Sequence, residues 1–267
     1  MVEKIRLERV SKTFTVRDEK QKGVVKQFTA VDNLDFVVNE GEFVTLVGPS
    51  GCGKSTMLDL LGGLSTPTKG RILIDGREIN GPGLDRGTVF QQYALFPWKT
   101  ARGNIEFGLE AKGIPKKEWK EQSDHYLDLV GLSNFADRYP HELSGGMKQR
   151  VAIARSLAFN PDVLLMDEPF AALDAQTRET LQAELLRIWE KTKKTIIFIT
   201  HGIDEAVYLG QRVVVLSPNP GSVKKIVDIP LKNRLADADI RSTKEFIEAR
   251  REVWSLLHEA EYTGAYI

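Results

Sequence analysis

The sequence predicts an α/β fold in which helices cover a mostly parallel β-sheet and a helical subdomain is inserted. Three features of the chain lead to this prediction. Short apolar runs typical of strands alternate with helical periodicity, a glycine-rich turn joins one strand to a helix, and a helical stretch interrupts the alternation. Alternating strands and helices form parallel sheets, because each helix returns the chain to start the next strand in the same direction. The length of 267 residues suits one large domain.

The first part of the chain carries mainly strand patterns. Apolar residues alternate or cluster as in strands, and the charged stretch Arg17–Lys26 is predicted to form a surface hairpin loop. The segment after the glycine-rich turn has apolar residues at helical spacing instead. The elements expected here are strands Ile5–Val10, Phe28–Val38 and Phe43–Val47, helix Lys54–Leu64, and strands Arg71–Ile74 and Gly87–Phe90.

The pattern becomes helical from about Pro97 to Ser156 and then returns to strands. Trp119, Tyr126 and Val130 are spaced for one helix face, which predicts an inserted helical subdomain. The elements expected after it are strand Val163–Met166, helix Ala175–Lys191, strands Thr195–Thr200 and Val213–Leu216, and a turn at Ser217–Ser222.

The tail from about Leu231 contains an amphipathic segment, Thr243–Glu259. Apolar residues such as Phe246, Val253 and Trp254 stand there among charges. We expect this segment to pack against the main domain, and a regulatory or membrane-docking role is the alternative.

The composition excludes several classes of protein. Lys plus Arg and Asp plus Glu both count 37, so the basic excess of a nucleic-acid binder is missing. Cys52 is the only cysteine, which rules out an intramolecular disulfide and suits the cytosol. The charged N-terminus lacks an apolar signal segment, and no run approaches the ~18 apolar residues that span a bilayer. Such a protein acts at a membrane only if it docks on chains that span it.

The segment Gly48–Thr56 matches the P-loop pattern Gly-x4-Gly-Lys-Ser. Its glycines let successive backbone N–H groups point at phosphate oxygens, and the following helix directs its positive dipole end at the same place. Lys54 is expected to neutralise the β- and γ-phosphates, and Ser55 to offer its hydroxyl to Mg²⁺. The expected nucleotide-contacting residues are Gly48, Pro49, Ser50, Gly51, Cys52, Gly53, Lys54, Ser55 and Thr56.

A pair of carboxylates follows the apolar strand Val163–Met166. At the tip of such a strand, Asp167 is suited to hold Mg²⁺ directly or through water. Glu168 lies one residue further on and is suited to polarise an attacking water as a general base. On their own, the two residues could equally be surface acids after a core strand, and the P-loop upstream favours the catalytic interpretation.

From Lys4 to about Val227 the chain resembles the ATP-binding cassette (ABC) ATPases. Leu143–Arg150, LSGGMKQR, looks like the family's signature motif, which meets the γ-phosphate held by the P-loop of a partner subunit. Ser144 and two glycines at a helix N-terminus supply donors to an anion, although a helix cap alone would explain these three residues. The resemblance implies a P-loop NTPase (RecA-like) core with an N-terminal antiparallel β element. It divides a single domain, 1–267, into a core (1–96 and 157–230), a helical subdomain (97–156) and a C-terminal extension (231–267).

The resemblance also assigns roles outside the P-loop. Gln91 matches the glutamine that senses Mg²⁺ and the attacking water, with Gln92 adjacent, and His201 matches the histidine that contacts the γ-phosphate. Phe14 resembles the aromatic residue that stacks on adenine, with Phe28 as the other choice. The implied catalytic residues are Glu168, His201 and Gln91. The implied Mg²⁺ ligands are Ser55, Gln91 and Asp167. The further ATP contacts implied are Phe14, Ser144, Gly145, Gly146, Gln149 and Asp174.

Finer details resemble the nitrate, sulfonate and taurine importer ATPases. Phe96-Pro97-Trp98 and Asp167–Glu179 are similar to that branch, as is Ile203–Leu216 followed by PNPGSV. Gly202 departs from the aspartate that importers often carry, and the segment Pro230–Arg234 is poorer in Pro-Arg than is common there.

The resemblance implies an ATPase that binds ATP and Mg²⁺ and powers uptake of a small anionic solute. Its expected partners are a second copy in a head-to-tail ATP sandwich, two permease subunits and, indirectly, a solute-binding protein. Its expected location is the cytoplasmic face of the cell membrane. A regulatory or non-transport cassette is the alternative. A DNA-repair scaffold is disfavoured, because it would need a long coiled coil between the P-loop and the signature. A GTPase is disfavoured as well, because it would need an Asn-Lys-x-Asp element, and Asn160–Asp162 does not match one.

Overall fold

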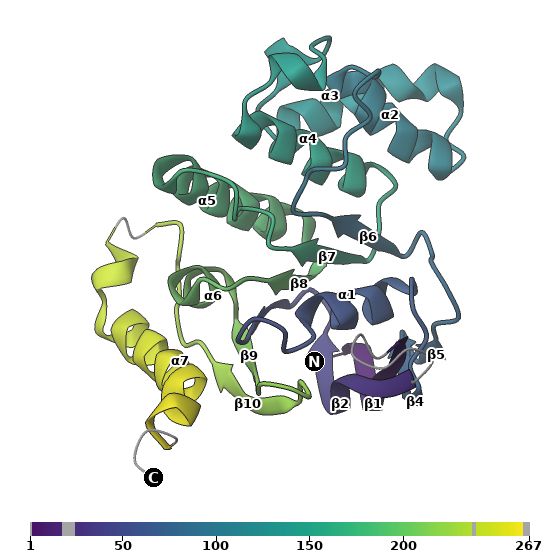
Figure 1. The fold of residues 1–267 in the computed structure, drawn as a ribbon. Helices are drawn as coiled ribbons and strands as arrows, with labels where there is room; N and C mark the ends of the chain where they lie inside the picture. The colour runs from purple at the N-terminus through teal and green to yellow at the C-terminus, as the bar shows by residue number, and fades with distance from the viewer. Residues whose placement is uncertain (1, 18–24, 237–238, 264–267) are drawn as a thin grey trace. The chain divides into compact units, whose positions relative to one another are not determined.

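The computed structural model describes residues 2–17, 25–236 and 239–263 of the chain (Figure 1). These residues form two compact units. The first unit comprises Met1–Pro82 and Phe198–Ile267, and the second comprises Gly83–Ile197. The P-loop and His201 therefore belong to the first unit, and the signature segment and the carboxylate pair belong to the second.

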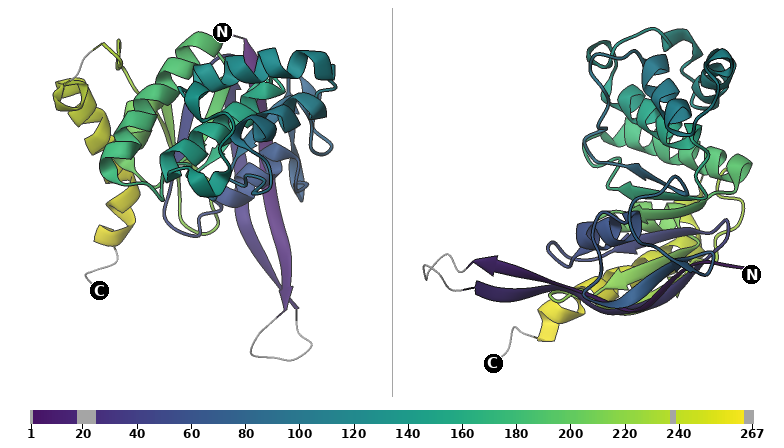
Figure 2. Two further views of the ribbon diagram at one scale, coloured as in Figure 1. Left: turned by 90° about the horizontal axis from the view of Figure 1, so that it is seen from above. Right: turned by 90° about the vertical axis from the view of Figure 1, so that its right-hand side faces the viewer.

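The first unit contains an antiparallel sheet with strand order β2-β1-β4-β5. Figure 2 shows β1 and β2 as one long twisted ribbon. Its inner face is apolar, with Leu7, Val10 and Leu34 fully buried. This sheet matches the antiparallel β element that the family resemblance implied. Its strands are β1 (Glu3–Arg17), β2 (Val25–Asn39), β4 (Lys69–Ile74) and β5 (Arg77–Glu78).

The first two strands extend further than their apolar pattern predicted. The backbone ladder continues through the pairs Thr13↔Thr29, Phe14↔Phe28 and Arg17↔Val25. The prediction of a loop over Arg17–Lys26 was therefore wrong at both of its ends, because ladder hydrogen bonds hold exposed polar residues in a strand without apolar alternation. Residues 18–24 of that stretch lie outside the described residues.

The first unit also holds β-strands of a second sheet, together with α1 and α6. β3 pairs in parallel with β9, and β10 pairs antiparallel with β9. β10 was not predicted, because its exposed Lys224 and Lys225 interrupt the apolar pattern of this edge strand. The elements are β3 (Phe43–Val47), α1 (Lys54–Gly62), β8 (Thr195–Ile199, crossing the unit boundary), α6 (Ile203–Leu209), β9 (Arg212–Leu216) and β10 (Val223–Asp228).

The predicted amphipathic tail segment forms α7 (Lys244–Thr263), which follows a short 3₁₀ turn at Ile240–Ser242. Phe246, Ala249 and Val253 lie at helical spacing and are buried, and α7 contacts α6, β9 and β10 within this unit. The expectation that this segment packs against the main domain is confirmed. Ile247 and Trp254 remain exposed.

The second unit combines two parallel strands with most of the chain's helices. β6 and β7 pair in parallel, and α2, α3 and α4 pack on one another. The helical stretch predicted between Pro97 and Ser156 is thereby confirmed. The elements are β6 (Arg86–Val89), α2 (Ala101–Ala111), α3 (Trp119–Leu129), α4 (Gly145–Ala158), β7 (Val163–Asp167) and α5 (Ala175–Thr192), with 3₁₀ turns at Lys116–Glu118, Ser133–Phe135 and Pro140–Glu142.

In the part of the chain that the structure describes, no helix combines the length and the apolar character needed to cross a membrane.

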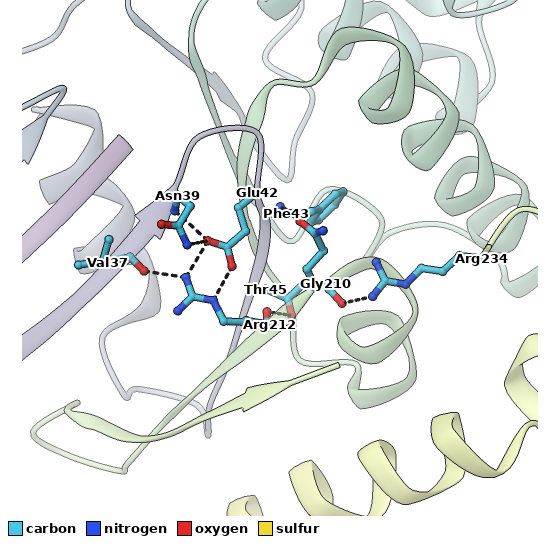
Figure 3. Close-up of polar contacts among 9 residues, drawn as sticks. Val37, Asn39, Glu42, Phe43, Thr45, Gly210, Arg212 and Arg234 are labelled. Carbon is cyan, nitrogen blue, oxygen red and sulfur yellow. Dashed lines mark hydrogen bonds and ion pairs between the residues drawn. The ribbon is translucent and has the colours of Figure 1, made fainter. Parts of the chain in front are cut away.

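A largely buried ion pair fixes the start of β9 in the first unit (Figure 3). Arg212 contacts both carboxylate oxygens of Glu42 and donates to the carbonyl oxygen of Val37 over 2.7 Å. The side chains of Arg212 and Glu42 are only 21% and 10% exposed. Removing one partner therefore leaves the other charge buried and uncompensated.

We expect Arg212→Met to lower the free energy of unfolding by about 2 kcal/mol. Removing one partner of a fully buried ion pair costs several kcal/mol of stability, and the loss is smaller here because this pair keeps some solvent contact. Urea unfolding followed by circular dichroism measures the change. Arg71→Met is the matched control, because Arg71 pairs with Glu8 at the surface and exposed pairs contribute about 0–1 kcal/mol. Equal losses of unfolding free energy in the two variants would contradict a special contribution of the buried Arg212–Glu42 pair.

Candidate functional site

The P-loop connects β3 directly to α1 in the first unit. β3 is fully buried, so the loop that follows it starts from a fixed point. Gly53 occupies the N-cap of α1 with φ 88°, a left-handed conformation that favours glycine. Lys54 folds its ammonium back over the loop and donates to the carbonyl oxygens of Gly48 and Pro49 over 2.8 and 3.2 Å. The loop is thus wrapped around a positive charge, which suits a phosphate.

The turn Ser217–Ser222 lies against this loop. Gly221 donates its N–H to Ala30 over 3.0 Å and accepts from Asp32 over 2.8 Å, which ties the turn to β2. A Cβ atom on Gly221 would overlap the carbonyl oxygen of Cys52, so only glycine fits there. The predicted turn is therefore packed directly on the backbone of the P-loop.

His201 is exposed and lies between the end of β8 and the start of α6. The hydroxyl of Thr200 accepts from the Gly202 N–H over 2.9 Å and also contacts the carboxylate of Glu205 in α6. The carbonyl oxygen of Gly202 accepts from the N–H of Ala206 over 2.9 Å. The backbone on both sides of His201 is therefore tied to the first turn of α6.

The two candidate adenine-stacking residues are direct neighbours. Phe14 and Phe28 are cross-strand partners of β1 and β2 and are 38% and 44% exposed. Residues directly opposite each other in a ladder share one face of the sheet. The Lys12 ammonium lies 5.1 Å from the centroid of the Phe14 ring. The backbone register thus places Phe28 beside Phe14 on the same face of the sheet.

In the second unit, the carboxylate pair stands where the sequence predicted it. Asp167 is the last residue of β7, and Glu168 follows with φ 42°. A left-handed backbone conformation is uncommon for a glutamate. Strained conformations of this kind are often found at functional sites. The carbonyl oxygen of Glu168 accepts from Ala171, which closes a turn. This turn directs the chain into the segment that ends at Asp174.

The signature segment starts α4. Ser144 caps the helix by accepting from the Met147 N–H over 3.3 Å. Gly145 faces Tyr93 and Leu173. Asp174 caps α5 in the same way, accepting from the Thr177 N–H over 2.9 Å, and this bond holds the pKa of its carboxyl below the usual range. The capped N-termini of α4 and α5 therefore lie near one another in this unit.

Three members of the predicted set of ATP contacts differ sharply in exposure. Ser144 and Asp174 are exposed, whereas Gln149 is completely buried. Neither amide atom of the Gln149 side chain has a hydrogen-bond partner among the described residues. A direct contact between Gln149 and a nucleotide would require this part of α4 to open.

Gln91 is exposed just after β6, at the start of a loop with unusual backbone. Tyr93 and Ala94 have φ 60° and 47°, and Arg155 of α4 donates to both of their carbonyl oxygens, over 3.1 and 2.6 Å. The Arg155 guanidinium also lies 5.7 Å from the centroid of the Phe96 ring. Arg155 therefore holds the loop that carries Gln91.

Two of the predicted Mg²⁺ ligands, Ser55 and Asp167, belong to different units of the chain. No group of three His, Cys, Asp or Glu side chains that could hold a metal occurs among the described residues. Mg²⁺ commonly takes only one or two protein ligands beside substrate phosphates. Ser55 is exposed at the start of α1, and Asp167 is half-buried at the end of β7.

Sequence reasoning missed two contributors to these segments, Gly221 and Arg155. Gly221 stood in a predicted turn, but its approach to Cys52 depends on a pairing distant in sequence. Arg155 carried a weak signal, since it follows the signature segment on the same helix.

The chain was compared with known proteins. A profile described as "ABC transporter" matches residues 31–171. An uncharacterized ABC transporter ATP-binding protein of Methanocaldococcus jannaschii, MJ0412, is 52% identical over 256 residues, which cover 96% of this chain and 92% of the relative. The nitrate import ATP-binding protein NrtD of Synechocystis is 52% identical over 88% of this chain and 91% of its own length. The taurine import ATP-binding protein TauB of Rhizobium johnstonii is 48% identical over 87% and 90%.

The fold is also similar to solved structures. A dimeric structure of a post-hydrolysis state of the ATP-binding cassette MJ0796, bound to ADP and Pi, matches with TM-score 0.72 and 35% identity, over 85% of this chain and 100% of that chain. A second dimeric structure of the same bacterial ABC transporter cassette matches with TM-score 0.72 and 36% identity.

Proposed function

The chain belongs to the ABC transporter family, and from this premise we propose that it is the ATP-hydrolysing subunit of an importer for a small anionic solute. The family match covers more than half of the chain, and relatives named for nitrate and taurine import are 52% and 48% identical to it. Nitrate and taurine both carry an anionic group, so a nitrate-, sulfonate- or taurine-like solute fits the branch. The identity to these import ATPases is the observation that carries the proposal.

We propose that ATP binds on the P-loop, with the Lys54 ammonium leaving the carbonyls of Gly48 and Pro49 for the phosphates. Adenine stacks on the ring of Phe14 or Phe28. The exposed Ser144, with Gly145 and Gly146 behind it, meets the γ-phosphate of the ATP held by a second copy. The dimeric state of the MJ0796 cassette supports pairing of two copies of this chain. The division of the chain at 97–156 and 231–267 remains a prediction.

The proposed chemistry follows from the types of side chain. Ser55, Asp167 and Gln91 would hold Mg²⁺, which would supply positive charge to the transferring phosphoryl group. Glu168 orients and deprotonates the attacking water, and His201 stabilises the γ-phosphate. Hydrolysis breaks the bond between the β- and γ-phosphates that links the P-loop of one copy to the signature segment of the other, and the dimer opens when phosphate leaves. Dimer closure and opening then move two permease subunits at the cytoplasmic face of the membrane.

Transport into proteoliposomes tests the proposal. The tagged protein is purified with the membrane chains that accompany it and reconstituted with its solute-binding protein outside and ATP inside. We expect uptake of radiolabelled nitrate, taurine or an alkanesulfonate that depends on internal ATP. ATP-dependent export, or ATP hydrolysis indifferent to every membrane chain, would overturn the importer assignment and favour the regulatory cassette.

A further inference from the structure

The helix that follows His201 is short and depends on its neighbours for its position. α6 has seven residues, Ile203–Leu209, and begins two residues after His201. Thr200 and Gly202 are joined by a hydrogen bond, and both residues contact this helix. On another side, Thr45 of β3 donates to the carbonyl oxygen of Ala206 over 3.1 Å. Any shift of α6 is therefore passed to the backbone that carries His201.

The C-terminal end of α6 is held by Arg234 from the tail (Figure 3). Its guanidinium donates to the carbonyl oxygens of Leu209 and Gly210, over 3.2 and 2.6 Å. A cation there meets the negative end of the helix dipole. Arg234 is 8% exposed, and burial lowers its pKa to about 10. Burying a charge is costly, so this contact is a built feature of the fold rather than an incidental surface bond.

Two further arginines of the tail contact the rest of α6. The Arg241 guanidinium lies 4.7 Å from the centroid of the Tyr208 ring, in cation–π geometry. Arg250 of α7 lies 3.5 Å from the Asp204 carboxylate, in the first turn of α6. The tail thus contacts the start, the last turn and the C-terminal end of the same helix. α7 itself is anchored on β10, where Lys225 pairs with Glu252 over 2.7 Å.

We propose that three arginines of the tail form a clamp on α6 that holds His201 in position for hydrolysis. Arg234, Arg241 and Arg250 are its positioning residues. The inference rests on the proposed function through the role given to His201. The clamp contacts α6 and Gly210, the residue that follows this helix. Loosening it should therefore slow hydrolysis and leave ATP binding unchanged.

The test compares turnover and ATP affinity in variants of the full-length protein. Arg241→Gln/Arg250→Gln removes the two more exposed contacts and keeps the fold, and Arg234→Met removes the buried one. We expect kcat to fall at least threefold in the double variant and at least tenfold in Arg234→Met, with the ATP dissociation constant within twofold of wild type. Arg241→Lys/Arg250→Lys keeps both cations and should restore at least half of kcat.

Lys244→Gln is the matched control, because the ion pair of Lys244 with Glu248 lies within α7 and does not touch α6. Its kcat should equal that of the wild type. A double glutamine variant with wild-type kcat, or one whose loss is not restored by lysine, would overturn the clamp.

His201→Ala separates this inference from the proposed function. Turnover that disappears in His201→Ala but persists in both clamp variants would overturn the clamp alone. Wild-type turnover in His201→Ala would overturn the role proposed for His201 and the clamp with it.

Discussion

Replacing Glu168 with glutamine is expected to lower ATP turnover at least a hundredfold, with ATP affinity unchanged, because a general base contributes about 10²–10⁴-fold to rate. Glu168 directly follows Asp167 at the end of β7 and is held by the turn that its carbonyl oxygen makes with Ala171. Glutamine has the same shape and keeps this turn. It cannot accept the proton of the attacking water, so only the chemical step is lost. Phosphate release and nucleotide titration measure the two quantities separately.

A second consequence follows from the proposed sandwich. Because the glutamine variant binds ATP without hydrolysing it, we expect ATP to convert the variant to a stable dimer in size-exclusion chromatography. Glu190→Gln, an exposed glutamate on α5, is the matched control and should hydrolyse ATP at the wild-type rate. Turnover within threefold of wild type in Glu168→Gln would remove Glu168 from the role of base.

Replacing Gly221 with alanine is expected to weaken ATP binding about a hundredfold, which corresponds to about 2.7 kcal/mol. A Cβ atom there overlaps the carbonyl oxygen of Cys52, so the Cys52–Gly53 peptide must turn. A peptide unit is planar, and the Cys52 carbonyl and the Gly53 N–H therefore turn together. The Gly53 N–H then no longer points at the phosphate. A hydrogen bond to a charged group contributes about 1.5–3 kcal/mol, and the neighbouring amides move with it.

Two hydrogen bonds close the turn that presents Gly221 and oppose a shift that would make room for the added methyl group. Ser217 donates its N–H to Ser222 over 2.9 Å, and the Ser222 N–H donates to the Ser217 hydroxyl over 3.0 Å. Gly103→Ala in α2 is the control, since a Cβ there meets the side chain of Lys99 at 3.3 Å and no distant backbone. Nucleotide titration and the melting temperature without ATP are measured together. A Gly221→Ala variant that folds and binds ATP within threefold of wild type would contradict the account.

Much of the fold could be predicted, because most of its elements have strong local signals. β3 and β7 are short, mainly apolar runs, and α5 has both a capping residue, Asp174, and regular apolar spacing. The P-loop and the Asp167–Glu168 pair were readable because each combines special residues with a flanking strand. The family resemblance added the signature segment, and the comparisons confirm the family.

The remainder depends on contacts between residues that are distant in sequence. The extension of β1 and β2 beyond their apolar residues requires the pairing of two strands, which no local pattern reports. The contact of Gly221 with Cys52 and the three arginine contacts on α6 have the same origin. The choice between Phe14 and Phe28 could not be made from sequence, because they are equivalent partners across one ladder.

The most direct test of the central claim is ATP turnover by the purified protein with and without its permease chains and loaded solute-binding protein. The account predicts turnover that requires Mg²⁺, is absent in Glu168→Gln and rises when permease and loaded binding protein are both present. Turnover that is identical with and without the membrane chains would contradict the claim that this ATPase drives a transporter.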